Sequence, residues 1–269
     1  MAGIVIIFDF DKTIVDCDSD NHVLDDLGAT DLFEELLLTM PWNAAMDTMM
    51  NNLHSQGRTI QEIEHSLKRV PVNPKAISAI KSAHALGCDL RIVSDANAFF
   101  IETVLKYHGL LDYFSEINTN PGFLDEEGHL RIQPYHDITG CSHASCPPNM
   151  CKGLIIDRIK SSALAEGERR FIYLGDGKGD FCPMTKFREE DFVMPRKGYP
   201  VWELICSSNP SMIKADIYEW SNWDDQERIL LQLITRIIYS GGVPSSLIST
   251  DHHFQTISIP IPISLKLTV

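Results

Sequence analysis

The hydrophobic and polar positions of this chain alternate between strand-like runs and helical periodicity. Ile4–Phe8 is a continuous apolar run, which is typical of a strand buried on both faces of a sheet. Further strands are predicted at 88–93, 113–118, 170–174 and 192–194, the last strand of the chain being 192–194. Helical patterns lie between them, at 74–86, 98–108, 151–163 and 224–239. Strands that alternate with helices predict an α/β fold, a doubly wound parallel sheet with helices on both faces.

Residues 16–73 interrupt this alternation with helical signals alone. Pro41 opens a helix from Trp42 to Gln56, and Thr59 and Glu62 have the spacing of a capping box for the next helix. We therefore expect a core formed by residues 1–15 and 74–240, with 16–73 as a small helical insert after the first strand.

Two other segments depart from the alternation. Residues 124–130 read as a hairpin turn between two short strands. The tail 241–269 has prolines at 244, 260 and 262 and two charged residues. Its isoleucines alternate as in a strand, but prolines confine such a strand to a sheet edge, so we predict a poorly ordered tail.

Composition excludes several classes of partner. The net charge is −14, from 23 basic and 37 acidic residues. This argues against a nucleic acid or an anionic membrane as partner. The first apolar run is too short for a membrane span and ends at Asp9. Seven scattered cysteines favour a reducing compartment, so we expect a cytoplasmic protein; the sequence does not define its oligomeric state.

Polar residues follow three of the predicted strands. Asp9 and Asp11 follow the strand 4–8, Ser94 and Asp95 follow 88–93, and Asp176 follows 170–174. Each lies at the strand end where open α/β sheets bind ligands. Carboxylates two residues apart can hold a divalent cation and supply a nucleophile and a proton donor. An acidic surface turn is the alternative, but it explains neither the phenylalanine between the two acids nor the threonine behind them.

These motifs resemble the haloacid dehalogenase superfamily. The resemblance rests on the sequence Asp-Phe-Asp-Lys-Thr at 9–13, on Ser94, on Lys152 and on the glycine-rich stretch 175–180. It implies that Asp9 attacks phosphorus and forms an aspartyl-phosphate. Asp11 would then be the general acid and base. A second acid at this position is typical of phosphatases or phosphomutases, and not of dehalogenases.

The resemblance also implies that residues 1–15 and 74–240 are the catalytic core and that the insert 16–73 is a cap over its active site. It further implies the remaining parts of the site. Mg²⁺ would be bound by Asp9, Asp176 and the backbone carbonyl of Asp11, with Asp180 as a supporting carboxylate. The groups that bind phosphate would be Thr13, Ser94 and Lys152. Lys160 lies two turns further along the same predicted helix and is the alternative to Lys152, which we favour because it lies nearer the strand ends.

A narrower resemblance is to the phosphoethanolamine/phosphocholine phosphatase family, whose relatives include thiamine phosphate phosphatase-like and pyrophosphatase-like proteins. It is carried by the sequences 9–20, 92–97 and 146–153. It implies that Asp20 and Asp95 contact the head group of the substrate. Trp42 or Phe99 would add a cation–π face, although core packing is the commoner role of such residues.

We therefore expect a small, amine-bearing phosphomonoester as substrate, such as phosphoethanolamine, phosphocholine or thiamine monophosphate. Inorganic pyrophosphate is the alternative, and it would need basic residues in the cap. The candidates are Arg58, Lys68 and Arg69. A phosphomutase on the same core and a non-enzymatic binding protein are further alternatives.

A loop rich in cysteine and histidine leaves a second question open. It contains His136, Cys141, His143, Cys146 and Cys151. The spacing does not match the usual zinc pairs, so a structural zinc site and thiols in an irregular loop are both possible. The remaining four, Cys17, Cys88, Cys182 and Cys206, we interpret as packing residues.

Overall fold

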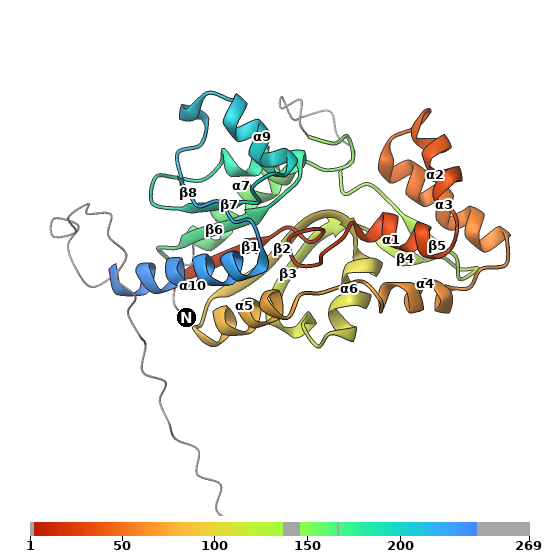
Figure 1. The fold of residues 1–269 in the computed structure, drawn as a ribbon, viewed down its shortest axis with the longest axis horizontal. Coiled ribbons are helices and arrows are strands. Elements are labelled where there is room, and N and C mark those ends of the chain that lie inside the picture. The colour runs from red at the N-terminus through yellow and green to blue at the C-terminus, as the bar shows by residue number, and fades with distance from the viewer. Residues whose placement is uncertain (1–2, 137–145, 166, 241–269) are drawn as a thin grey trace, which may run out of the picture.

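The computed structural model describes residues 3–136, 146–165 and 167–240, and its centre is one parallel sheet. Six strands lie in the order β3-β2-β1-β6-β7-β8 (Figure 1). Their bounds are β1 Ile4–Phe8, β2 Asp89–Asn97, β3 Phe114–Asn120, β6 Arg170–Gly175, β7 Phe192–Pro195 and β8 Asp216–Ile217. Every pairing is parallel, so the carboxyl ends of the strands meet at one edge. The doubly wound α/β fold is confirmed.

Strand β1 lies in the middle of the sheet because all five of its side chains are apolar and buried. Ile4, Ile6 and Phe8 face one hydrophobic cluster, whereas Val5 and Ile7 face the other. Alternate residues of a strand point to opposite faces, so a strand covered on both sides has no polar positions.

Helices cover both faces. The first face packs against α5 Pro74–Ala85, α6 Ala98–Tyr107 and α10 Trp223–Ser240. The second packs against α7 Lys152–Ala165, α8 Phe181–Met184 and α9 Pro200–Ser207. Local sequence sets several of these starts. Asn73 caps the N-terminus of α5 ahead of Pro74, and Asn97 caps α6 by accepting a hydrogen bond from the Phe100 N–H.

Four helices lie between β1 and α5: α1 Ser19–Asp26, α2 Thr30–Leu37, α3 Trp42–Ser55 and α4 Ile60–Leu67. The predicted capping box of α4 is present, with the Thr59 side chain accepting from the Glu62 N–H and Glu62 accepting from the Thr59 N–H. Asp18 caps α1 by accepting from the Asn21 N–H. The four helices extend from one end of the sheet (Figure 1).

A hairpin from a later part of the chain joins these helices. Strands β4 Gly122–Leu124 and β5 Leu130–Ile132 are antiparallel, as the turn sequence predicts. Arg131 forms a bidentate ion pair with Asp47 of α3, with nitrogen–oxygen distances of 2.9 and 2.6 Å. The Ile132 N–H also donates to Asp47. Helix α3 therefore receives support from a distant hairpin, which was not predicted from the sequence.

Some strand predictions were wrong in detail. β7 is followed by β8, so 192–194 is not the last strand. Strand β2 continues through Ser94 and Asp95 to Asn97, with its register to β3 shifting after Val93. β8 has two residues, both exposed, and such a short strand leaves no periodic signal in the sequence.

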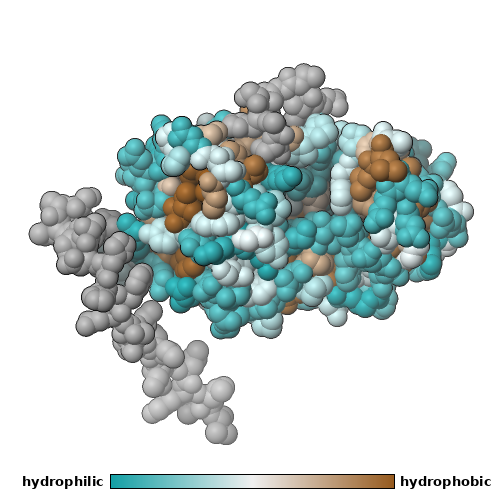
Figure 2. All heavy atoms as spheres, turned by 45° about the horizontal axis from the view of Figure 1, so that its top comes forward, coloured by the Kyte–Doolittle hydropathy of each residue, from teal (hydrophilic) through white to brown (hydrophobic). Residues whose placement is uncertain are grey.

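The surface is largely hydrophilic on the face shown in Figure 2, with separate hydrophobic patches. In the described part of the chain, none of the helices has the length and apolar character that a membrane crossing needs. The predictions for the tail 241–269, for Cys141 and for His143 lie outside the described residues.

Candidate active site

The loop after β1 places Asp9 and Asp11 at the carboxyl edge of the sheet. Asp9 continues the pairing with β6, since its N–H donates to the Leu174 carbonyl at 2.9 Å. The Phe10 carbonyl then accepts from the N–H groups of residues 13, 14 and 15, and Lys12 has a φ of +53°, in the left-handed region. This turn reverses the chain within a few residues and keeps both acids at the strand end.

Lys152, the first residue of α7, lies at the centre of a group of carboxylates. Its Nζ is 2.8 Å from Asp9 Oδ2, 2.9 Å from Asp180 Oδ1 and 3.5 Å from Asp95 Oδ1. The Lys152 side chain is 2% exposed. Lys160, the alternative, points elsewhere, with its Nζ 3.8 Å from Asp191 and donating to the Lys186 carbonyl. Of the two lysines, Lys152 is therefore the one that lies beside Asp9, as predicted from its place nearer the strand ends.

Asp180 shapes the loop after β6. Its carboxylate accepts hydrogen bonds from the N–H groups of Asp176 and Gly177 and from the Tyr173 hydroxyl, at 3.0, 2.9 and 2.6 Å. A Cβ at Gly175 would lie 2.4 Å from the Asp180 carboxyl carbon, so glycine is required there. The role of Tyr173 was not foreseen, because its position in an apolar strand gives no sign of a polar contact.

The carboxylates of Asp9, Asp176 and Asp180 form a group whose oxygens lie within 4.8 Å of one another. Carboxylate oxygens are the ligands that Mg²⁺ prefers, so this donor set fits the ion that the sequence implies. Thr13 Oγ1 lies 3.5 Å from Asp176 Oδ1. The Asp11 carboxylate points away from the group and accepts from the Ser19 N–H at 3.0 Å. The Asp11 side chain is thus not one of the three carboxylates of this group.

Ser94 is buried at the same edge of the sheet. Its Oγ accepts from the Ala96 N–H at 3.3 Å, within the part of β2 where the register to β3 shifts. This hydrogen bond leaves the hydroxyl proton of Ser94 available to an anion.

Burial dominates the electrostatics of these acids. It raises the pKa of Asp9 well above its ordinary value, with Asp180 adding to the effect and Lys152 opposing it. It also raises the pKa of Asp176 to about 7, again with Asp180. Burial acts in the opposite direction on Lys152, but Asp180, Asp9 and Asp95 outweigh it and raise the pKa of this lysine. Lys152 therefore stays charged. A further cation would stabilise the charged forms of the carboxylates around it.

A cavity of about 590 Å³ opens over Asp9 and Lys152. Besides Asp9, Asp11 and Lys152, the residues that line it include Asp18, Asp20, Trp42, Asp95, Cys146, Pro147 and Lys178. Trp42 therefore lines the site, whereas Phe99, its alternative, lines a separate hollow. No role in this site was predicted for Cys146, Pro147 or Lys178, although all three lie in the stretches 146–153 and 175–180 that carry the resemblance.

Asp20 is the most unusual residue of this cavity. It is 6% exposed, and its Oδ2 accepts from Trp42 Nε1 at 2.7 Å. Its Oδ1 is buried without a hydrogen-bond partner among the described residues. Burial, helped by Asp18, raises the pKa of Asp20 to about 7, against the hydrogen bond from Trp42. Asp95 also reaches the cavity, and its side chain is 46% exposed.

The basic residues considered for a pyrophosphate pocket lie outside this cavity. Arg58 pairs with Glu62, Lys68 with Glu64 and Arg69 with Asp26, all in exposed positions. None of the three is among the residues that line the cavity, whose cations are Lys152 and Lys178.

The fold and this group of carboxylates are those of a phosphatase of the haloacid dehalogenase type. Residues 4–234 match the model of the family described as "Putative Phosphatase", and the chain belongs to this family. The resemblance seen in the sequence is thereby confirmed.

Named relatives agree with this assignment. The chain is 54% identical to inorganic pyrophosphatase 2 of Arabidopsis thaliana, covering 98% of each chain. It is 55% identical to a thiamine phosphate phosphatase-like protein of the same plant, covering 88% of this chain and 98% of the relative. With human phosphoethanolamine/phosphocholine phosphatase it shares 30% identity, covering 86% and 89%.

The structure comparison supports the same fold. A substrate-bound phosphoserine phosphatase superposes with a TM-score of 0.56 at 15% identity, covering 84% of this chain and 96% of the other. Since the chain is a phosphatase of this type, the open questions concern its metal, its substrate and the roles of single residues.

Proposed function

We propose that the protein is a Mg²⁺-dependent phosphatase of small phosphomonoesters whose leaving group carries a positive charge. The observation that carries the substrate class is Asp20, whose buried Oδ1 has no hydrogen-bond partner in the described structure. Leaving a carboxylate oxygen buried and unpaired is costly, and an ammonium or thiazolium group in the cavity removes that cost.

The proposed catalytic steps use Asp9 and Asp11. An Asp9 oxygen attacks phosphorus while Asp11 donates its proton to the departing ester oxygen, which leaves an aspartyl-phosphate. Burial, with Asp18 and Asp20, raises the pKa of Asp11, which favours the protonated form that the first step needs. Asp11 then takes a proton from water, and the resulting attack releases inorganic phosphate and restores Asp9.

The remaining site residues stabilise charge. Lys152 holds Asp9 and Asp180 and offers a buried cation to the phosphate, while Thr13 and Ser94 offer hydroxyl groups. Asp9, Asp176 and the backbone carbonyl of Asp11 would hold Mg²⁺, with Asp180 supporting the Asp176 loop. When bound, the ion neutralises the phosphate and the carboxylate nucleophile so that they can approach.

Helices α1 and α3 contribute residues to the wall of the cavity. Trp42 and Asp20 come from these helices and face the residues of the core across the cavity. We propose that 16–73 acts as the cap over a core of 1–15 and 74–240, and that it selects the leaving group. The expected location remains the cytoplasm.

Inorganic pyrophosphate is the second candidate, and it is favoured by the name of the 54% identical relative. A second phosphate would meet Asp18, Asp20 and Asp95 in place of the leaving group. It would need Lys178 or a further metal ion to offset their charge.

A substrate panel separates the two candidates. Phosphate release is measured from phosphocholine, phosphoethanolamine, thiamine monophosphate, pyridoxal phosphate, glycerol phosphate and pyrophosphate, with and without Mg²⁺. We expect the cationic substrates to have the highest kcat/KM and all rates to need Mg²⁺. A preference for pyrophosphate would refute the substrate class, and exchange of phosphate between two sugars without free phosphate would indicate a phosphomutase. Hydrolysis of no panel member would favour a binding protein.

A further inference from the structure

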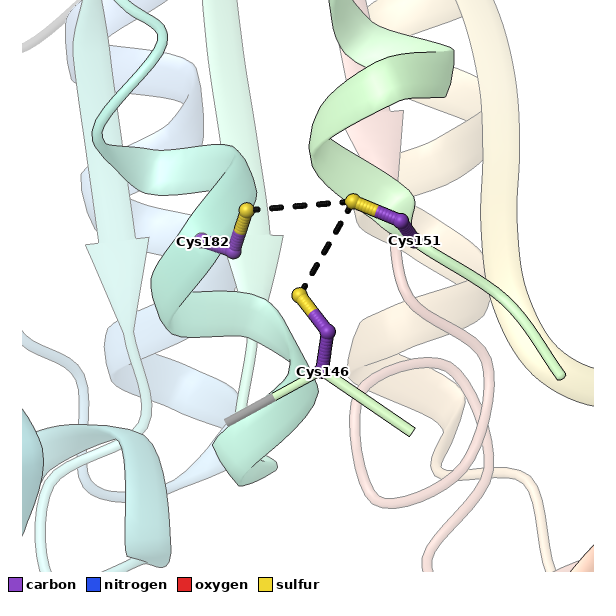
Figure 3. Close-up of side chains that lie close together, drawn as sticks. All are labelled: Cys146, Cys151 and Cys182. Carbon is purple, nitrogen blue, oxygen red and sulfur yellow. Dashed lines mark hydrogen bonds between the residues drawn. The ribbon is translucent and has the colours of Figure 1, made fainter. Parts of the chain in front are cut away.

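Three cysteines that are separated in the sequence meet beside the active site. Cys146 lies in the segment before α7, Cys151 directly precedes α7, and Cys182 is in α8. Figure 3 shows their side chains pointing toward one another from these three segments. The sulfur of Cys151 is 3.8 Å from that of Cys146 and 3.9 Å from that of Cys182, and all three lie within 4.8 Å of one another. Cys182 is therefore more than the packing residue that the sequence suggested.

The spacing of the sulfurs fits a common metal ligand sphere. A tetrahedral zinc ion with Zn–S bonds of about 2.3 Å places its thiolate sulfurs roughly 3.8 Å apart. Two packed thiols also touch at such a distance, but packing does not require a third sulfur to face the same point. A disulfide would need sulfurs about 2.05 Å apart.

The residues around the three sulfur atoms allow them to lie close together. A Cβ at Gly153 would lie 2.5 Å from Cys182 Sγ and 3.6 Å from Cys151 Sγ, so the glycine lets α7 approach the sulfurs. The same Cβ would be 3.3 Å from Cε of Lys186, which places an ammonium group near the cluster. The Lys186 ammonium group also pairs with Asp157, at 3.0 Å. Three thiolates around one divalent cation carry a net charge of −1, which this ammonium group offsets in part.

We propose that Cys146, Cys151 and Cys182 form a zinc site that is separate from the carboxylate site of the catalytic metal. Thiolates select zinc over magnesium, and carboxylates favour magnesium. On binding, each thiol releases its proton to solvent and forms one Zn–S bond. The described residues bring no fourth histidine, cysteine or acid into the group.

The position of this site gives it a role in positioning the catalytic residues. Cys151 directly precedes Lys152, and Cys182 follows Asp180 by two residues. Cys146 itself lines the active-site cavity. A zinc ion bound by the three cysteines links these three segments and so fixes the positions of Lys152 and Asp180 beside the cavity.

The test measures zinc in the full-length protein, independently of phosphatase activity. The chain is produced in zinc-supplemented medium, exchanged into Mg²⁺ buffer and analysed for metals by mass spectrometry. We expect about one zinc ion per chain in the wild type. It should be absent from Cys146→Ser and Cys182→Ser. Cys88→Ser is the matched control, because Cys88 is buried in the other hydrophobic cluster. Asp176→Asn should also keep its zinc, since it changes only the carboxylate group.

A second measurement needs no variant. Cobalt substituted for zinc in the wild type should give the thiolate-to-cobalt charge-transfer absorption of a tetrahedral sulfur site. Zinc that is absent from the wild type, or retained by Cys182→Ser, would overturn the proposal. So would a mass two hydrogens lower than the sequence requires, which would indicate a disulfide. A chain that hydrolyses no substrate but binds this zinc would still support the site.

Discussion

The pH dependence of substrate selection follows from the burial of Asp20. Burial, with Asp18, raises the pKa of this carboxyl to about 7. Below pH 7 the Asp20 side chain is then largely neutral, and above pH 7 it is charged. If it binds a cationic leaving group, selection for that group should be weak in acid and should strengthen as the pH rises through 7.

The magnitude can be worked out from this pKa. A single group with a pKa of about 7 is roughly 10% ionised at pH 6 and roughly 90% ionised at pH 8. A cation about 4 Å from the carboxylate gains up to ~4 kcal/mol at an effective dielectric constant of about 20. Its own desolvation offsets part of this, and a net ~1.4 kcal/mol corresponds to about tenfold selection. With about tenfold selection by the charged form and none by the neutral form, these ionised fractions give a selection of about 1.9-fold at pH 6 and about 9-fold at pH 8. We therefore expect the selection to increase by about fivefold between pH 6 and pH 8.

The assay is the ratio of kcat/KM for phosphocholine to kcat/KM for glycerol phosphate at each pH. The quaternary ammonium of phosphocholine keeps its charge, and the ionisation of the catalytic acids cancels in the ratio. The second phosphate pKa differs between the two substrates, so each is titrated separately and its ionisation is divided out of the ratio. Because kcat/KM reports the free enzyme, the midpoint of the curve gives the pKa of Asp20 before substrate binds. Asp20→Asn is the control and should give a low ratio that does not vary with pH.

Two results would refute this reasoning. A ratio that is independent of pH in the wild type would show that the carboxyl does not face the leaving group. A ratio that still rises in Asp20→Asn would assign the effect to another acid of the cavity, with Asp95 as the first candidate.

Three further predictions concern neighbouring residues. Trp42→Phe removes the hydrogen bond that lowers the pKa of Asp20, so the midpoint of the same curve should move above 7; a midpoint that stays or falls contradicts the contact. Asp9→Asn should reduce kcat by roughly 10⁴-fold or more, because it removes the nucleophile, and rapid-quench labelling should find no phosphorylated enzyme; surviving activity would exclude this role. Lys152→Met should reduce kcat by about 10²–10³-fold and destabilise the fold by ~3–5 kcal/mol in urea unfolding at pH 8, since it leaves buried carboxylates unpaired. Lys160→Met, on the same helix, is its control and should keep normal kcat; equal losses would argue for a purely structural effect.

Local sequence was sufficient wherever a short segment determines its own structure. The apolar run of β1, the capping box at Thr59 and the hairpin around 124–130 all formed as predicted. The boundary between strand and loop was less predictable. Strand β2 runs on through Ser94 and Asp95 because its pairing with β3 resumes after a register shift, and that pairing involves residues distant in the sequence.

Contacts between distant segments were the part that sequence reasoning missed. The ion pair of Arg131 with Asp47 joins a hairpin to α3 across more than 80 positions, and no local pattern indicates it. Likewise, no local pattern indicates that the sulfur of Cys182, in α8, lies beside that of Cys151, which directly precedes α7. Cys206, predicted to be a packing residue, is exposed.

For the candidate site, the sequence by itself determined which residue types lie at the strand ends. A parallel α/β sheet brings the ends of β1, β2 and β6 to one edge, so Asp9, Ser94 and Asp176 had to meet there whatever the details of packing. The tertiary structure alone decided which charges are buried and which are paired. It placed Lys152 between Asp9 and Asp180, and it left one oxygen of Asp20 buried without a partner. The physical reason is that burial and pairing depend on how elements pack in space, whereas the residue types available at each strand end are written in the sequence.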